Sequence, residues 1–93
     1  MTATEQALKL IEAAEDAYSR AVLADAPLET SLESAAAYLR ELGADPLTMA
    51  TAIRLLEGFA RKQASAGNDD HADTNRRISN LLRAANKPLV AAN

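Results

Sequence analysis

The stretch LETSLESAAAYLRELG, residues 28–43, carries apolar side chains at alternating spacings of four and three residues. These positions are Leu28, Leu32, Ala35, Leu39 and Leu42. Such spacings place all of these side chains on one face of an α-helix. A glycine directly after the last of them is typical of a helix C-terminus, because glycine adopts the left-handed conformation without steric cost. The stretch therefore predicts an amphipathic helix that ends just before Gly43.

The segment before this stretch has the same pattern, with alanine supplying much of the apolar stripe. Thr2 and Glu5 have the spacing of a capping box, which predicts a helix that begins near Thr2. The pattern is interrupted after Ala24. We expect Asp25 to cap the following helix and Pro27 to lie in its first turn, where the missing N–H costs nothing.

The segment after Gly43 opens with Asp45 and Pro46, which read as the N-cap and first position of a third helix that runs to about Ala66. Because the link is so short, we expect the second and third helices to form an antiparallel pair. Gly58 lies inside the third helix at a cost of about 1 kcal/mol relative to alanine. Close passage of a neighbouring helix is the favoured explanation, and a kink or frayed turn is the alternative.

A fourth helix is predicted after the polar loop that contains Gly67. Its candidate first residues are Asp70, Asp73 and Thr74, and Lys87-Pro88 ends it. The sequence therefore predicts an all-α fold, a bundle of about four mostly antiparallel helices. We expect one domain over residues 1–88 and a C-terminal tail over residues 89–93.

The predicted core is thin for a chain of 93 residues, because roughly half of its 48% hydrophobic residues are alanine. Burying an alanine methyl contributes about 0.8 kcal/mol, against about 1.5–3 kcal/mol for a leucine or isoleucine side chain. Small chains with little core often bury further surface against a partner. We therefore expect a homodimer or a complex with another protein.

Charge is divided between the two halves of the chain. Residues 1–45 contain nine acids and three bases, a net charge of −6, whereas residues 46–93 contain four acids and seven bases, a net charge of +3. The favoured interpretation is that the two halves attract each other within one bundle. The alternative is that the second half presents a basic face to an acidic partner.

The candidate metal-binding residues lack the required companions. Glu12, Glu15 and Asp16 form an acidic cluster on the first predicted helix, but no second set of carboxylates is placed to complete a magnesium site. Residues 68–73 resemble a calcium-binding loop in composition only, and His71 has no second His or Cys at ligand spacing. We interpret both features as solvated polar surface, and predict no metal site.

No arrangement of residues indicates catalysis. The serines have no adjacent base, the glycines are isolated, and the chain has no cysteine. We therefore predict a protein that is not an enzyme and binds no cofactor.

Nucleic-acid binding is the alternative function. Residues 32–56, with Gly43 at the bend, could form a helix-turn-helix, and a second route is the basic face of the last two predicted helices. Against both, the chain is acidic overall and has three aromatic residues, which provide no stacking platform.

Membrane binding is not indicated. No apolar run approaches the roughly 20 residues that a membrane-spanning helix needs. The N-terminus lacks a basic region followed by an apolar block. We expect a cytoplasmic protein, although a chain exported by a signal-independent route would look the same.

These observations predict a non-enzymatic protein-interaction module that acts through helix-packing surfaces. The candidate contact residues are Leu28, Leu32, Leu39 and Leu42. The competing and favoured interpretation is that this stripe is intramolecular core. The candidate electrostatic guides for an acidic partner are Arg76, Arg77 and Arg83.

Overall fold

Residues 2–86 are described by the computed structural model, and they form four α-helices without any strand. The helices are α1 (Ala3–Leu23), α2 (Leu28–Glu41), α3 (Pro46–Ser65) and α4 (Asp69–Asn86). The all-α fold of about four helices predicted from the sequence is confirmed. The predicted stop at Lys87-Pro88 and the predicted tail 89–93 lie outside the described residues.

The N-termini of α1 and α3 are capped as the sequence predicts. The Thr2 hydroxyl oxygen accepts a hydrogen bond from the backbone N–H of Glu5 (3.1 Å), and the same hydroxyl donates to the Glu5 carboxylate (3.2 Å). At α3, the Asp45 carboxylate accepts from the backbone N–H of Thr48 (2.8 Å), and Pro46 is the first helical residue. This backbone hydrogen bond is the main reason why the pKa of Asp45 is lowered.

The start of α2 differs from the prediction. Pro27, not Asp25, is the residue that precedes the first helical position, and no side chain caps this helix. Pro27 has an extended conformation with ψ of 134°, so it lies outside the first turn. An N-cap side chain bonds the N–H groups two or three positions further on. Since Asp25 lies two residues before the cap position, it is too early in the chain to reach them.

Two glycines with positive φ end α2 and α3. Gly43 has φ +72° and its N–H donates to the carbonyl oxygen of Arg40 (3.2 Å), as expected for a helix C-terminus. Gly67 has φ +83°, and the N–H of Asn68 donates to the Gln63 carbonyl (2.8 Å). This turn reverses the chain so tightly that α4 begins at Asp69, earlier than each of the predicted starting residues.

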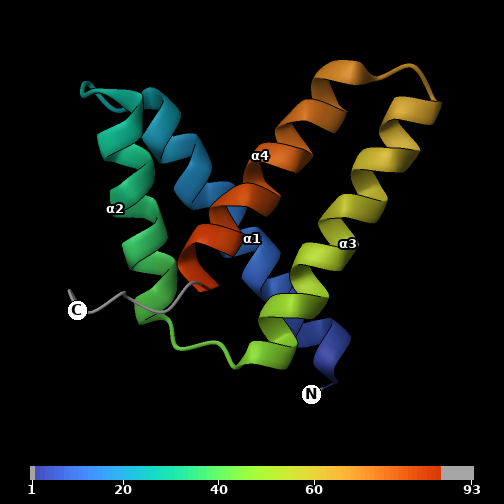
Figure 1. Cartoon of the computed structure of the whole chain (residues 1–93), viewed down its shortest axis with the longest axis horizontal. Helices are drawn as coiled ribbons and strands as arrows, with labels where there is room; N and C mark the ends of the chain where they lie inside the picture. Colours follow the sequence, from blue (N-terminus) through green and yellow to red (C-terminus); the bar gives the residue numbers. More distant parts are fainter. Residues whose placement is uncertain (1, 87–93) are drawn as a thin grey trace, which may run out of the picture.

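The helices form two hairpins, α1–α2 and α3–α4, that pack against each other (Figure 1). Within the described residues, α2 contacts α1 and α4, and α3 contacts α1 and α4, but α2 and α3 do not contact each other. The predicted antiparallel pairing of α2 with α3 is therefore wrong. Both helices instead contact α1 and α4, and the short link between them runs across the end of the bundle (Figure 1).

The core combines a few large side chains with many alanines. Leu39, Leu56 and Leu82 are the largest side chains that are fully buried. The buried alanines are Ala7, Ala14, Ala17, Ala21, Ala35, Ala36, Ala52, Ala60, Ala72 and Ala85. Small facing side chains let helix axes approach toward the low end of the usual distance range of about 8–10 Å. The alanines of the apolar stripes that the sequence displays are therefore part of the core.

Gly58 does not have the role that the sequence suggested. A β-carbon placed there would meet only one side-chain atom within 4 Å, the Arg61 Nη2 at 3.9 Å on the same helix. Since no neighbouring helix passes that close, the favoured explanation of this glycine is wrong. The helix is continuous through Gly58, from Pro46 to Ser65.

Two side-chain contacts between helices were not predicted. The Arg40 guanidinium of α2 donates through Nε to the carbonyl oxygen of Ala85 (3.2 Å) and through Nη2 to that of Ala84 (3.0 Å). These carbonyls belong to the last turn of α4, which lacks helical partners for them. In the second contact, the Thr48 hydroxyl donates to the Gln6 side-chain oxygen (3.2 Å), which links α3 to α1.

None of the described helices combines the length and the apolar character that crossing a membrane requires.

Candidate interaction surfaces

The leucine stripe of α2 is not one continuous surface. Leu39 is fully buried in the core and Leu32 is half-buried against it, whereas Leu28 and Leu42 are about half exposed. At a rise of about 1.5 Å per residue, the two exposed leucines lie about 21 Å apart, at opposite ends of the helix. Of the four candidate contact residues, the structure therefore leaves Leu28 and Leu42 at the surface, but not together.

An open groove of about 420 Å³ lies between α1 and α2. Small apolar side chains dominate its lining: Ala17, Ala21, Ala24, Ala26 and Ala35. Ala17, Ala21 and Ala35 are buried and form its floor. The hydroxyl-bearing residues Thr30, Ser31 and Ser34 line it from α2. The floor of the groove is therefore made of small apolar side chains, and hydroxyl groups lie along its α2 side.

The rim of this α1–α2 groove is partly aromatic and partly charged. Tyr38 lines it and is half exposed. Arg20 and Asp16 also line it and form an ion pair of 3.0 Å on α1. Leu23 and Leu28, which are 84% and 51% exposed, bracket the connection between the two helices. One end of the groove therefore meets an exposed apolar surface.

The three arginines proposed as guides do not form one patch. Arg83 of α4 pairs with Glu57 of α3, and Arg76 pairs with Asp73 (3.0 Å). The pKa of Arg77 is raised, mainly by a side-chain hydrogen bond with Tyr18, which places Arg77 on the side of α1. The structure therefore brings Arg76 and Arg83 together and separates Arg77 from them.

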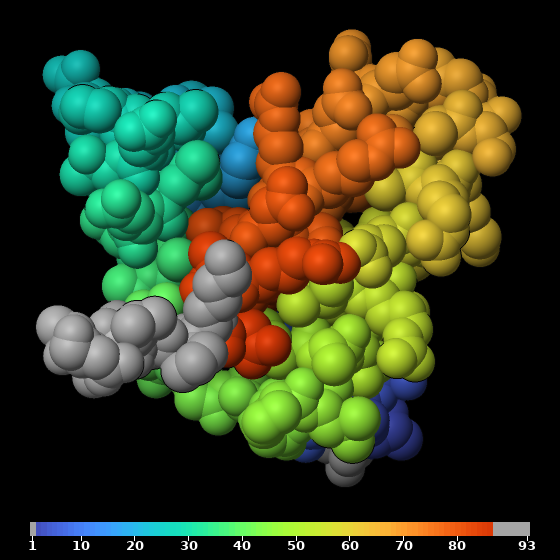
Figure 2. Space-filling model, in the orientation of Figure 1, coloured from blue at the N-terminus to red at the C-terminus, as the bar shows by residue number. Residues whose placement is uncertain are grey.

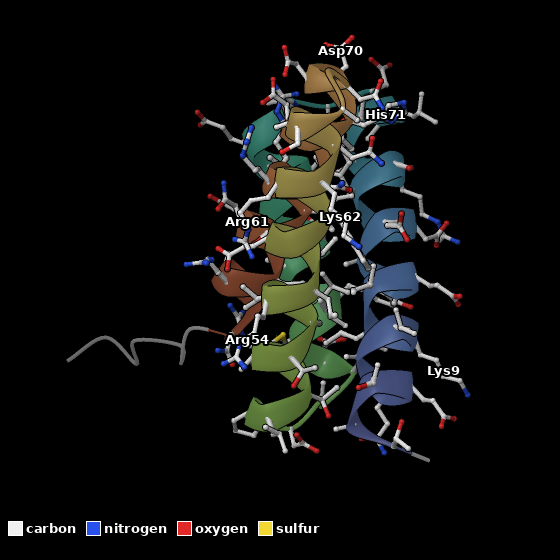
Figure 3. All side chains as sticks on the ribbon, turned by 90° about the vertical axis from the view of Figure 1, so that its right-hand side faces the viewer. Lys9, Arg54, Arg61, Lys62, Asp70 and His71 are labelled. Carbon is white, nitrogen blue, oxygen red and sulfur yellow. The ribbon has the colours of Figure 1, made fainter. Side chains whose placement is uncertain are left out.

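A second groove, of about 430 Å³, lies between α3 and α4. Its lining residues are Glu57, Ala60, Arg61, Arg76, Ser79, Asn80 and Arg83. Arg61 leaves α3 on the side of α4, whereas Lys62 leaves it on the side of α1 (Figure 3). Three guanidinium groups therefore border one cavity.

Ser79 lines this α3–α4 groove but is not among the candidate site residues of the sequence analysis. Its side chain is 2% exposed, and its hydroxyl oxygen has no hydrogen-bond partner. In the sequence it was one of several helical serines without a base. Its spacing from Arg76 and Arg83, three residues before and four after, is the one signal that places it on their face of α4.

The acidic residues of the sequence analysis lie at the surface. Glu12, Glu15 and Asp16 are exposed on α1. Asp70 and His71 lie at the start of α4, at the end of the molecule farthest from Lys9 in Figure 3. Over residues 2–86, no three His, Asp or Glu side chains are grouped so that they could hold a metal ion.

Comparisons with protein-family models, with curated proteins and with solved structures find no match to this chain.

Proposed function

We propose that this protein is a non-enzymatic interaction module whose α1–α2 groove receives an amphipathic helix of another protein. The observation that supports this proposal is the alanine-lined groove, which opens beside the exposed Leu23 and Leu28. Exposed apolar surface of this kind marks interaction sites more often than isolated apolar residues do.

The shape of the lining suits a helix better than a small ligand. Small-molecule sites combine an apolar wall with several convergent polar groups that fix orientation. Here the floor is made of alanine methyl groups. The polar side chains of the lining are the hydroxyl-bearing residues of α2 and the Asp16–Arg20 pair of α1, whose charges already bind each other. A helix can approach such a floor closely and insert leucine-sized side chains between the two rims.

The charge around the groove favours a basic partner helix. Glu29 and Glu33 are exposed beside the lining residues Thr30 and Ser34, and residues 1–45 have a net charge of −6. A second copy related by a two-fold axis would place two acidic surfaces against each other, which costs binding energy. The homodimer remains a prediction from the sequence, and the experiment below separates it from a basic partner.

The test uses two fluorescent synthetic helices with identical leucine faces, one flanked by lysine and the other by glutamate. We expect saturable binding of the lysine peptide by anisotropy, with NMR shifts confined to residues around Ala21 and Ser34. Its affinity should fall with added salt, because the flanking charges are screened. Equal binding of both peptides, or shifts elsewhere on the protein, would refute the proposal.

A groove-filling variant provides the matched control. Ser34→Phe places a ring in the groove from an exposed position, whereas Ser19→Phe places the same ring on an exposed position of α1 that does not line it. Binding of the lysine peptide should be lost in the first variant and kept in the second. If light scattering shows self-association that Ser34→Phe abolishes, a second copy occupies the groove and the basic-partner proposal is wrong.

The alternative function, a DNA-binding regulator, has less support. A helix-turn-helix needs its two helices packed together, and α2 and α3, which contain residues 32–56, do not contact each other in the described residues. The remaining support is the set of basic side chains on α3 and α4. Three of them border one cavity, which suits a small anion better than DNA.

A further inference from the structure

The α3–α4 groove combines positive charge with hydrogen-bond donors. Arg61 from α3 and Arg76 and Arg83 from α4 border it, and Asn80 adds an amide. One carboxylate, that of Glu57, lines the same cavity and pairs with Arg83. Three guanidinium groups and one carboxylate give the lining a formal charge of +2. In Figure 2, α4 crosses the front of the molecule with α3 beside it.

Ser79 supplies the second observation. Its hydroxyl is buried without a partner, although a helical serine can donate to the carbonyl four residues earlier. Buried polar groups without hydrogen bonds are uncommon in folded proteins, and each calls for an explanation. Ser79 is one of the residues that line the groove, and at 2% exposure its hydroxyl lies below the molecular surface there.

The arginines retain capacity for an anion. The described residues form three ion pairs, and Arg61 belongs to none of them. Arg76 pairs with Asp73 at 3.0 Å through Nη1, and this contact is exposed. Exposed pairs of this type contribute little, so an incoming anion can replace the carboxylate at small cost.

We propose that the α3–α4 groove binds the phosphate group of a small phosphate monoester. The guanidinium groups of Arg61 and Arg76 donate to the phosphate oxygens in the forked geometry that suits them. The Ser79 hydroxyl and the Asn80 amide donate to them as well. A dianion also matches the +2 charge of the lining, which a monocarboxylate does not.

A nucleic acid fits the same surface less well. Binding a duplex requires a row of cations that follows its backbone. Here, Glu57 and Asp73 lie among the arginines, so the positive charge is confined to one cavity. This inference is independent of the proposed helix-binding function, because the two grooves share no lining residue.

The first test is a calorimetric and NMR titration of the whole chain with phenyl phosphate, inorganic phosphate and sodium sulfate. We expect saturable binding of phenyl phosphate, with shifts at Ser79 and Asn80. Binding should weaken below about pH 6, where the monoester loses its second charge. Equal affinity for inorganic phosphate shows that the free ion is the ligand, and equal affinity for sulfate shows nonspecific anion binding. Both results overturn the proposal.

Variants locate the binding site. Arg61→Gln removes one exposed cation, and we expect it to weaken phenyl phosphate binding about tenfold, as loss of a charge-assisted hydrogen bond does. Arg20→Gln is the matched control on α1, and should leave binding unchanged. An equal loss in both variants, or none in Arg61→Gln, would contradict the assignment. Since Arg61 is exposed, its replacement does not threaten folding.

Ser79→Ala separates a binding role from a structural one. It should reduce affinity several-fold while leaving the melting temperature of the free protein unchanged or higher, because an unpartnered buried hydroxyl is removed. A lower melting temperature together with unchanged affinity would mean that the hydroxyl serves folding, and would overturn its role here. If a short DNA duplex binds more tightly than phenyl phosphate and loses affinity in Arg61→Gln, the ligand of this groove is a nucleic acid and not a phosphate monoester.

Discussion

At the residue scale, the sequence suggests that Gly58 makes room for a neighbouring helix, and the structure shows that it does not. In the structure, the place that a β-carbon would take at this residue is open apart from Arg61, so glycine gives no packing benefit there. Its backbone is helical and its φ is not positive. The residue therefore contributes only the usual entropic cost of a glycine in a helix.

We therefore expect Gly58→Ala to stabilise the protein by about 0.5–1 kcal/mol. In a domain of this size, each kcal/mol raises the melting temperature by about 4–8 °C. Urea and thermal unfolding measure the change. Gly43→Ala is the control with the opposite sign, because φ of +72° strains an alanine. A destabilised Gly58→Ala would restore the interpretation that a neighbouring helix passes close to this position.

Two of the three predicted helix caps succeeded, whereas the cap predicted at Asp25 does not form. The caps at Thr2 and Asp45 depend on spacings of three residues, which the sequence displays directly. The role of Ser79 could not be predicted in the same way, because it depends on a cavity that exists only when α3 and α4 pack. The same holds for Leu28 and Leu39, which share one helical stripe but differ in burial according to which helices cover them.

At the scale of the elements, the four helices were predictable because periodicity and end signals are properties of short segments. Which helices pack against each other was not predictable in this way. A short link commonly joins antiparallel neighbours, but Gly43 and the residues after it lead the chain across the end of the bundle instead. The pairing of α2 with α4 also depends on Arg40, whose partners lie more than 40 residues further along the chain.

We expect Arg40→Met to destabilise the protein by about 1–2 kcal/mol, because two carbonyls at the end of α4 lose charge-assisted donors. Methionine keeps most of the apolar length of the side chain. Hydrogen exchange should then show faster opening of the last turn of α4 than of α1. Arg20→Met is the control, since its exposed ion pair is worth about 0.5 kcal/mol or less. If both variants lose the same stability, the contact with α4 has no special value.

At the scale of the whole molecule, the division of charge can be compared with the arrangement of the hairpins. The negative half of the sequence contains α1 and α2, and the positive half contains α3 and α4. The three ion pairs among the described residues lie within α1, within α4, or between α3 and α4. No direct ion pair therefore joins the two hairpins in the part of the chain that the structure describes. This favours a role for the charge division in meeting partners over a role in folding.

Stability and partner binding should consequently respond differently to salt. Raising NaCl to about 0.5 M shortens the screening length to about 4 Å, which suppresses interactions between separated surface charges. We expect the melting temperature to change by no more than about 2 °C, because apolar burial and backbone hydrogen bonds dominate the fold. Over the same range, the affinity for the lysine-flanked helix should fall several-fold. Calorimetry and anisotropy measure the two quantities on one sample.

A large drop in melting temperature with constant peptide affinity would contradict this prediction. It would show that the opposite charges of the two hairpins hold the molecule together, and that the acidic surface of α1 and α2 does not select a basic partner.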